Sequence, residues 1–198
     1  MTDKARRTPT GAAVLKPELT DAIVEAVLEE LAEHGYGRLS MDAVARRAGV
    51  GKSALYRRWP SKEEMTVDVV SRLSVPMAAV GDTGSLRGDV RAMVEAILDW
   101  LAHPRLGRIL LDLVAEAKRN EALASALTAH LGDPRRSLGE AVLDRGLARG
   151  EISAELDREL ALDLFAAPVF WRTGVRRVAA TPGYLDNLTE SLLRMLTP

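Results

Sequence analysis

The sequence predicts an all-α protein with a small N-terminal helix-turn-helix domain and a larger C-terminal helical domain. Three observations predict this fold class. Apolar residues recur three and four positions apart along most of the 198 residues, the spacing of one face of a helix. Proline, glycine and capping residues separate these segments. Positive charge gathers in one N-terminal stretch, although the net charge of the whole chain is only −1.

Residues 1–16 are expected to form a disordered basic arm, because they are polar, lack helical periodicity and contain Pro9 and Gly11. Residues 17–60 are expected to form the helix-turn-helix domain. Its first helix, residues 17–34, is amphipathic and begins at a proline, which suits a first turn.

Two short helices follow, joined by a tight turn. Ser40 is a good N-cap for the first of them, and Gly49 suits the left-handed conformation that ends it. In the second, which Pro60 stops, Leu55 and Trp59 are four residues apart and are expected to point inward. The outward face then carries Lys52, Ser53, Tyr56 and Arg57.

Charge supports a surface role for this segment. Residues 38–62 hold seven basic side chains and one acid, a local charge of +6, so the rest of the chain sums to −7. A basic face with short polar donors is what binding to phosphates requires. The alternative is a solvated basic surface on an ordinary pair of helices.

Residues 61–80 are expected to connect the two domains. Ser61 and Glu64 form a capping box for a helix that runs to about residue 75, and a glycine-rich cluster at 81–85 marks the junction. Residues 85–198 read as helices throughout. We expect helices at 86–102, around 109–117, from Asn120 to about 147 with a kink at 132–134, after Asp157, and from about 184 to 196.

Composition excludes several classes of function. The chain has no cysteine, so thiolate metal sites and cysteine nucleophiles are absent, and no apolar run is long enough to span a bilayer. The three histidines lie in separate helical segments, and no glycine-rich phosphate loop is present. We therefore expect a cytoplasmic protein that does not act on membranes and has no catalytic residues, metal site or cofactor.

The run from Leu39 to Met65 resembles the N-terminal domain of the TetR family of bacterial transcriptional regulators. The matching residues are Gly35-Tyr36, Ser40-Met41, Ala45-x-x-Ala48-Gly49-Val50, Lys52-x-x-Leu55-Tyr56-x-x-Trp59 and Ser61-Lys62-Glu63-Glu64. The resemblance implies a homodimer that binds double-stranded DNA. Because a two-fold dimer reads two half-sites, the operator is expected to be an inverted repeat.

The DNA-binding side chains can then be assigned roles. Lys52, Tyr56 and Lys62 are expected to bind phosphates, with Ser40 adding a hydroxyl, whereas Arg58 suits either role. Ser53 and Arg57 are the expected base readers, since a guanidinium fork pairs with guanine O6 and N7. The arm at 1–16 is either an inert terminus or a further contact to the minor groove or phosphates.

The end of the chain predicts an interface between protomers. Residues 164–171 are apolar on every side of a helix, which indicates burial on every side. The resemblance implies that the last two long helices pair with their copies, so the expected interface residues are Phe170, Trp171, Leu185, Leu188 and Leu192. The alternative is that the aromatic residues belong to the core of a single chain.

The resemblance also implies an effector pocket in the C-terminal helices, for a small apolar or amphipathic molecule that releases a repressor from its operator. The candidate lining residues are Met93, Ile97, Trp100, His103, Leu110, Leu113, Val114 and Phe165. Each of them also suits a plain helix-bundle core. A DNA-binding architectural protein with no effector is the alternative function, and the sequence does not separate a repressor from an activator.

Overall fold

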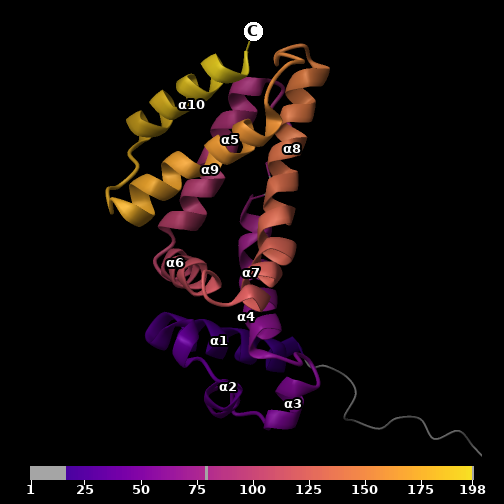
Figure 1. Ribbon diagram of the computed structural model, residues 1–198, viewed down its shortest axis with the longest axis vertical. Helices are drawn as coiled ribbons and strands as arrows, with labels where there is room; N and C mark the ends of the chain where they lie inside the picture. Colours follow the sequence, from indigo (N-terminus) through magenta and orange to yellow (C-terminus); the bar gives the residue numbers. More distant parts are fainter. Residues whose placement is uncertain (1–16, 79, 198) are drawn as a thin grey trace, which may run out of the picture.

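The computed structural model describes residues 17–78 and 80–197, in which every regular element is a helix. Helices α1 (Pro17–Arg38), α2 (Met41–Arg47) and α3 (Lys52–Tyr56) lie together at one end of the molecule (Figure 1). From this end α4 (Lys62–Ser74) runs toward the remaining helices, which fill the other end. The predicted all-α class with two helical parts is confirmed.

The C-terminal helices are α5 (Leu86–Ala102), α6 (Leu106–Ala117), α7 (Glu121–Leu127), α8 (Asp133–Ala148), α9 (Arg158–Phe170) and α10 (Pro182–Leu196). A short 3-10 helix at Pro76–Ala78 follows α4. A π-helical turn at Thr128–Gly132 joins α7 to α8, and another at Trp171–Val175 follows α9. Within the described residues, no helix has both the length and the apolar content needed to cross a membrane.

The predicted kink at residues 132–134 is present as a change of helical register. The π-helical turn ends at Gly132, and Pro134 occupies the first turn of α8. Proline has no N–H to donate to the preceding turn, so an unbroken α-helical ladder is not available there. Residues 121–148, which we call the α7–α8 segment, are therefore helical throughout, with a change of register at 128–132.

Side-chain caps explain where most helices begin. Ser61 accepts a hydrogen bond from the backbone N–H of Glu64 at 3.1 Å, which pairs a donor that the first turn of α4 leaves unsatisfied. The same arrangement is found at Ser40, Ser85, Asn120, Asp157 and Thr181. The caps predicted at Ser40, Ser61, Asn120 and Asp157 are thus confirmed.

Two hydrophobic cores hold the helices together. The first contains Val27, Leu55 and Met65 of the N-terminal part and continues into α6 and α7 through Ile109 and Leu123. The second fills the space between α5, α8, α9 and α10. Because the first core crosses from one part to the other, α1 cannot leave α6 without exposing apolar surface to water.

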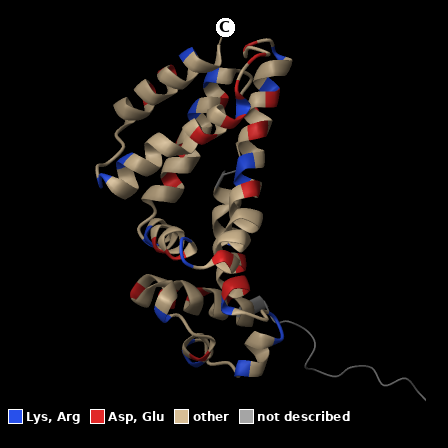
Figure 2. Ribbon diagram, in the orientation of Figure 1, with Lys and Arg blue, Asp and Glu red and all other residues tan. Residues whose placement is uncertain are grey.

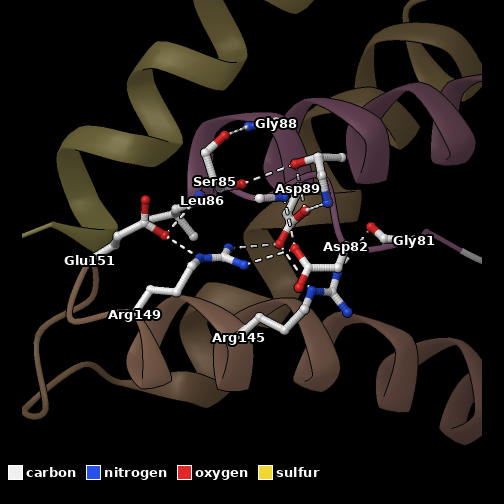
Figure 3. Close-up of polar contacts among 11 residues, drawn as sticks. Gly81, Asp82, Ser85, Leu86, Gly88, Asp89, Arg145, Arg149 and Glu151 are labelled. Carbon is white, nitrogen blue, oxygen red and sulfur yellow. Dashed lines mark hydrogen bonds and ion pairs between the residues drawn. The ribbon is translucent and has the colours of Figure 1, made fainter.

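A polar network fixes the far end of the C-terminal helices (Figure 3). Asp89 of α5 is fully buried and pairs with Arg145 at 3.0 Å and Arg149 at 2.8 Å, both from α8. Its other carboxylate oxygen accepts the backbone N–H of Thr83 at 2.8 Å. Burial alone would raise the pKa of Asp89, but the hydrogen bonds from Arg149, Thr83 and Arg145 outweigh it and hold the pKa well below its usual value.

Candidate functional site

The turn between α2 and α3 sets the orientation of α3. Gly49 has a φ of 66°, in the left-handed region, and Val50 donates its backbone N–H to the carbonyl of Ala45 at 3.0 Å. Leu55 is fully buried, and Trp59, just beyond the helix, is nearly so. These two inward anchors, predicted from the sequence, fix which side of α3 faces outward.

The outward side of α3 is open to solvent. Lys52, Ser53, Tyr56 and Arg57 are all exposed, and Tyr56 exposes 51% of its surface although it is a large aromatic residue. Ser40, at the start of α2, is exposed as well. Figure 2 shows basic residues at this end, the end opposite α10. The four side chains therefore share a short, exposed helix face that suits a major groove.

The positive charge that this segment exposes on the surface is smaller than the charge counted along its sequence. Arg47 points toward α1 and pairs with Glu29, Glu30 and Glu33 at 3.0, 2.8 and 2.6 Å. The charge of +6 counted over residues 38–62 therefore includes a cation that α1 already neutralises. Arg47 is better described as the residue that fastens α2 to α1.

Lys52 is also paired, with Asp42 of α2. Both side chains are largely exposed, so a phosphate can compete with Asp42 for the ammonium group. Among residues 17–78 and 80–197, Arg46 and Arg57 form no ion pair with any acidic side chain. Arg57 is thus the unpaired cation on the outward face of α3.

Arg58 and Lys62 make contacts inside the N-terminal part. Arg58 donates to the hydroxyl of Thr20 at 2.6 Å and lies over the ring of Trp59, 4.8 Å from its centroid. The amino group of Lys62 donates to the carbonyl of Tyr36 at 3.2 Å and lies 4.2 Å from the centroid of its ring. The DNA contacts predicted for these two residues would require them to leave those positions.

A contact between α1 and α6 was not predicted from the sequence. The backbone N–H of Tyr36 donates to the carboxylate of Asp112 at 2.6 Å. Gly35 makes this approach possible, because its φ of 73° breaks the helix there. Asp112 therefore joins the end of α1 to the C-terminal helices.

Asp68 ties α4 to the helix-turn-helix formed by α2 and α3, residues 41–59, which we call the reading unit. One carboxylate oxygen accepts the indole N–H of Trp59 at 2.8 Å, and the other accepts from Arg72 at 2.8 Å. Trp59 also anchors the end of α3, so this hydrogen bond links α4 to α3. The hydroxyl of Tyr36 donates to Glu63 at 2.8 Å and adds a second link near the start of α4.

A cavity of about 670 Å³ lies among α5, α6, α7, α8 and α9. Ligand pockets in proteins have about this volume, roughly 300–1,000 Å³. Six of the residues predicted for an effector pocket line this cavity, namely Met93, Ile97, Trp100, Leu110, Val114 and Phe165.

The other two candidates do not line this cavity. His103 ends α5, where its Nδ1 accepts the backbone N–H groups of Arg105 and Leu106 at 3.3 and 3.2 Å. Leu113 is fully buried in the first hydrophobic core. The helical period put both residues near the predicted pocket, but His103 lies at a helix end and Leu113 belongs to the first hydrophobic core instead.

Sequence reasoning missed the part of the cavity wall that the α7–α8 segment contributes. That wall includes Leu127, Leu131, Arg135, Arg136 and Gly139. The proline and glycine signal at 132–134 marked a kink, but the period of a straight helix could not show which residues the change of register turns inward. The two arginines, Arg135 and Arg136, are therefore among the lining residues that the sequence did not predict.

The predicted dimer residues divide into two groups. Leu185 and Leu192 are buried within the single chain, in the second hydrophobic core, so their assignment to a partner surface is corrected. Phe170 and Leu188 are half-buried, and Trp171 exposes 59% of its surface. The aromatic end of α9 is thus left open in one chain.

Family comparisons identify the domains. Residues 23–69 match the model described as bacterial regulatory proteins, tetR family, and residues 80–192 match that of the tetracyclin repressor-like C-terminal domain. The chain belongs to the TetR family. It is therefore a DNA-binding transcriptional regulator and not an enzyme, as predicted, and TetR-family regulators act as dimers.

Two relatives named as transcriptional regulators have comparable length. The chain is 35% identical over 150 residues to the DNA-binding transcriptional repressor TetR of Mycobacteroides abscessus, covering 74% of this chain and 77% of the relative. It is 28% identical over 173 residues to the HTH-type transcriptional regulator YdeS of Bacillus subtilis, covering 87% of each.

Two solved structures have the same fold. The TetR family transcription regulator SCO0332 superimposes with a TM-score of 0.73 at 28% identity, covering 91% of this chain and 100% of that one. GusR of Salmonella enterica superimposes with a TM-score of 0.75 at 20% identity, covering 93% and 98%. The second likeness concerns the fold alone.

Proposed function

We propose that this regulator is a repressor that binds an inverted-repeat operator as a homodimer and is released by a small apolar or amphipathic molecule. The observation that carries the proposal is the outward face of α3, which stays exposed because Leu55 and Trp59 hold the opposite face inside. The relative from M. abscessus is named a repressor, which favours repression over activation for this chain. A protein that binds a bacterial chromosome acts in the cytoplasm, and we extend the proposal to that location.

The contacts to DNA follow from exposure and charge. Arg57 has no acidic partner in the described residues and carries the fork that reads guanine. Ser53 is the second base reader on the same face. Lys52 and Tyr56 bind phosphates on either side, and the hydroxyl of Ser40 adds a contact at the start of α2. These roles separate affinity from specificity, since phosphate contacts carry no direct sequence information.

The dimer uses the open end of α9 together with α10. Trp171 is the strongest candidate for its centre, because a large exposed aromatic side chain is an unusual surface feature and a common interface anchor. Phe170 and Leu188 border it. This surface lies toward the end of the molecule opposite α3, so the two reading helices of a dimer stay free for DNA (Figure 1).

Release requires a path from the cavity to α3, and α4 offers one. At its beginning α4 is tied to the reading unit through Asp68 and Trp59. At its end the carbonyl of Ser74 accepts a hydrogen bond from Arg135, which lines the cavity. A ligand that favours one position of α4 changes the spacing of the two reading helices and therefore the affinity for the operator.

Selection of bound fragments from random DNA tests this function. Purified protein is expected to recover an inverted repeat whose half-sites are about one helical turn apart, 10–10.5 base pairs from centre to centre, or a multiple of that distance. Recovery of no enriched motif, or of a single unrepeated half-site, would contradict the proposal.

A further inference from the structure

The cavity is lined mainly by apolar side chains, but two arginines from α8 also reach it. Arg136 pairs with Glu159 and, at 3.0 Å, with Asp163, which also lines the cavity, so these two acids of α9 neutralise its charge. Arg135 differs. No Asp or Glu in the described part of the chain lies within ion-pair distance of its guanidinium. This includes the exposed Asp133, which also lines the cavity.

Arg135 is held in place without a counter-charge. Its guanidinium carbon lies 3.7 Å from the centroid of the Trp100 ring, and its Nη1 donates to the carbonyl of Ser74. Its Nη2 is buried and has no hydrogen-bond partner in the described residues. Burial lowers the pKa of Arg135 to about 10, which still leaves the group charged at neutral pH.

Trp100 also has a buried hydrogen-bond donor without a partner in the described residues. The residue is only 8% exposed, and its indole Nε1 is buried with no hydrogen-bond partner in the described residues. Buried donors are nearly always paired, because leaving one unpaired destabilises the folded state. Because the two side chains stack on each other, both unpaired donors belong to one part of the cavity wall, and Met93, Leu131 and Phe165 line the same cavity.

We propose that this cavity binds the carboxylate of an amphipathic organic acid, with the carboxylate at Arg135 and Trp100 and an apolar tail along α5, α6 and α9. A carboxylate supplies the missing negative charge and accepts from both unpaired donors. An ammonium ligand has no acceptor to offer these donors. A dianionic phosphate would bring a second charge that no further unpaired cation of the described cavity wall neutralises.

Arg135 also connects this ligand to α4. Its Nη1 holds the last residue of α4, and its Nη2 faces the proposed carboxylate. A ligand that draws the guanidinium toward the cavity therefore acts on the helix that carries the reading unit. This inference rests on the proposed function, because it names the chemistry and the contact of the effector that the repressor would respond to.

Calorimetric titration with three ten-carbon probes tests the proposal: decanoate, 1-decanol and decylamine. We expect decanoate to bind about tenfold or more tightly than the other two, since a charged hydrogen bond is involved. Equal binding of decanoate and decanol, or no binding of decanoate, would overturn the proposal. Either result would leave the proposed DNA-binding function intact, which the affinity for a selected operator measures separately.

Two variants assign the preference to Arg135. R135M keeps the aliphatic stem and is expected to bind decanoate and decanol within about threefold of each other, because only the cation is lost. R136M, the next residue, removes a cation that is already paired and is expected to keep the preference. Loss of the preference in R136M, or its survival in a folded R135M, would overturn the assignment.

A third variant covers the case in which R135M does not fold. W100F replaces the indole with a smaller aromatic ring that has no N–H, and it is expected to weaken decanoate binding severalfold while decanol binding stays within about twofold. Unchanged decanoate binding in W100F would remove Trp100 from the site. In the unaltered protein, decanoate is expected to lower operator affinity, and R135M is expected to abolish that response.

Discussion

At the scale of single residues, Arg47 shows how a basic side chain in a DNA-reading unit can serve the fold. It pairs with three acids of α1, and one of them, Glu30, is itself buried. We expect Arg47→Ala to lower the free energy of unfolding by about 2 kcal/mol, because it leaves the Glu30 carboxylate without its cation. Urea denaturation measures this change.

The adjacent residue supplies the control. Arg46 is exposed and has no acidic partner in the described residues, so Arg46→Ala is expected to stay within about 0.5 kcal/mol of the unaltered protein. Equal destabilisation by the two substitutions would show that the pairing of Arg47 with α1 does not stabilise the domain.

Asp89 gives a prediction that depends on pH. Its folded pKa is lowered, so its contribution to stability is present above the unfolded pKa near 4 and is lost as the pH falls through the folded pKa. Asp89→Asn is expected to lower the free energy of unfolding by about 3 kcal/mol at pH 7, because Arg145 and Arg149 lose their shared partner. The difference from the unaltered protein should narrow below about pH 4.

Asp82 is the matched control for Asp89. It also pairs with Arg149, at 2.9 Å, but its side chain is largely exposed. Asp82→Asn is expected to change stability by less than about 1 kcal/mol, as exposed ion pairs do. A pH-independent difference between Asp89→Asn and the unaltered protein would contradict the assignment of the network to the charge of Asp89.

At the scale of helices, the break in α1 at Gly35 positions the contact with α6. A Cβ at Gly35 would lie 3.3 Å from both carboxylate oxygens of Asp112, and the φ of 73° is one that other residues rarely adopt. Gly35→Ala is therefore expected to destabilise the protein by about 1–2 kcal/mol through the backbone, and further through the loss of the Asp112 contact.

Gly49 separates these two effects. Its φ is 66°, but a Cβ there would have no atom within 4 Å. Gly49→Ala should therefore cost only the backbone term, about 1–2 kcal/mol. Thermal unfolding of both variants decides the matter, and equal losses would mean that the Asp112 contact adds nothing to the docking of α1 on α6.

The helices themselves were largely predictable from the sequence, because their signals are local. Ser40, Ser61, Asn120 and Asp157 cap the elements that they were expected to cap, since a cap needs only its own first turn. Contacts between helices were not predictable in this way. The periodicity of α10 put Leu185 and Leu192 on an apolar face, but only the packed chain shows that this face is already covered.

The candidate sites follow the same division. The outward face of α3 could be predicted because the turn at Gly49 and the anchors Leu55 and Trp59 are close in sequence. The pairing of Arg47 with α1 and the part played by Arg135 in the cavity join segments that are distant in sequence. No local pattern reports such pairings, so they required the structure.

At the scale of the whole molecule, the proposed dimer depends on the open end of α9. Trp171→Glu is expected to shift the protein to a monomer at micromolar concentration, because an exposed aromatic anchor is replaced by a charge. Operator affinity should fall with it. Leu147→Glu, at an exposed leucine on α8, serves as the control. Sedimentation that finds both variants equally dimeric would place the interface elsewhere.

The central claim is that exposed side chains of α3 read the bases of the operator. The most direct measurement is selection from random DNA, repeated with Arg57→Ala and with Lys52→Ala. Arg57→Ala is expected to lose about 1–3 kcal/mol of preference at one symmetric pair of positions in the recovered repeat. Lys52→Ala should keep the motif, weaken all sequences alike and reduce the salt dependence. An unaltered motif with Arg57→Ala, at wild-type affinity, would contradict the claim.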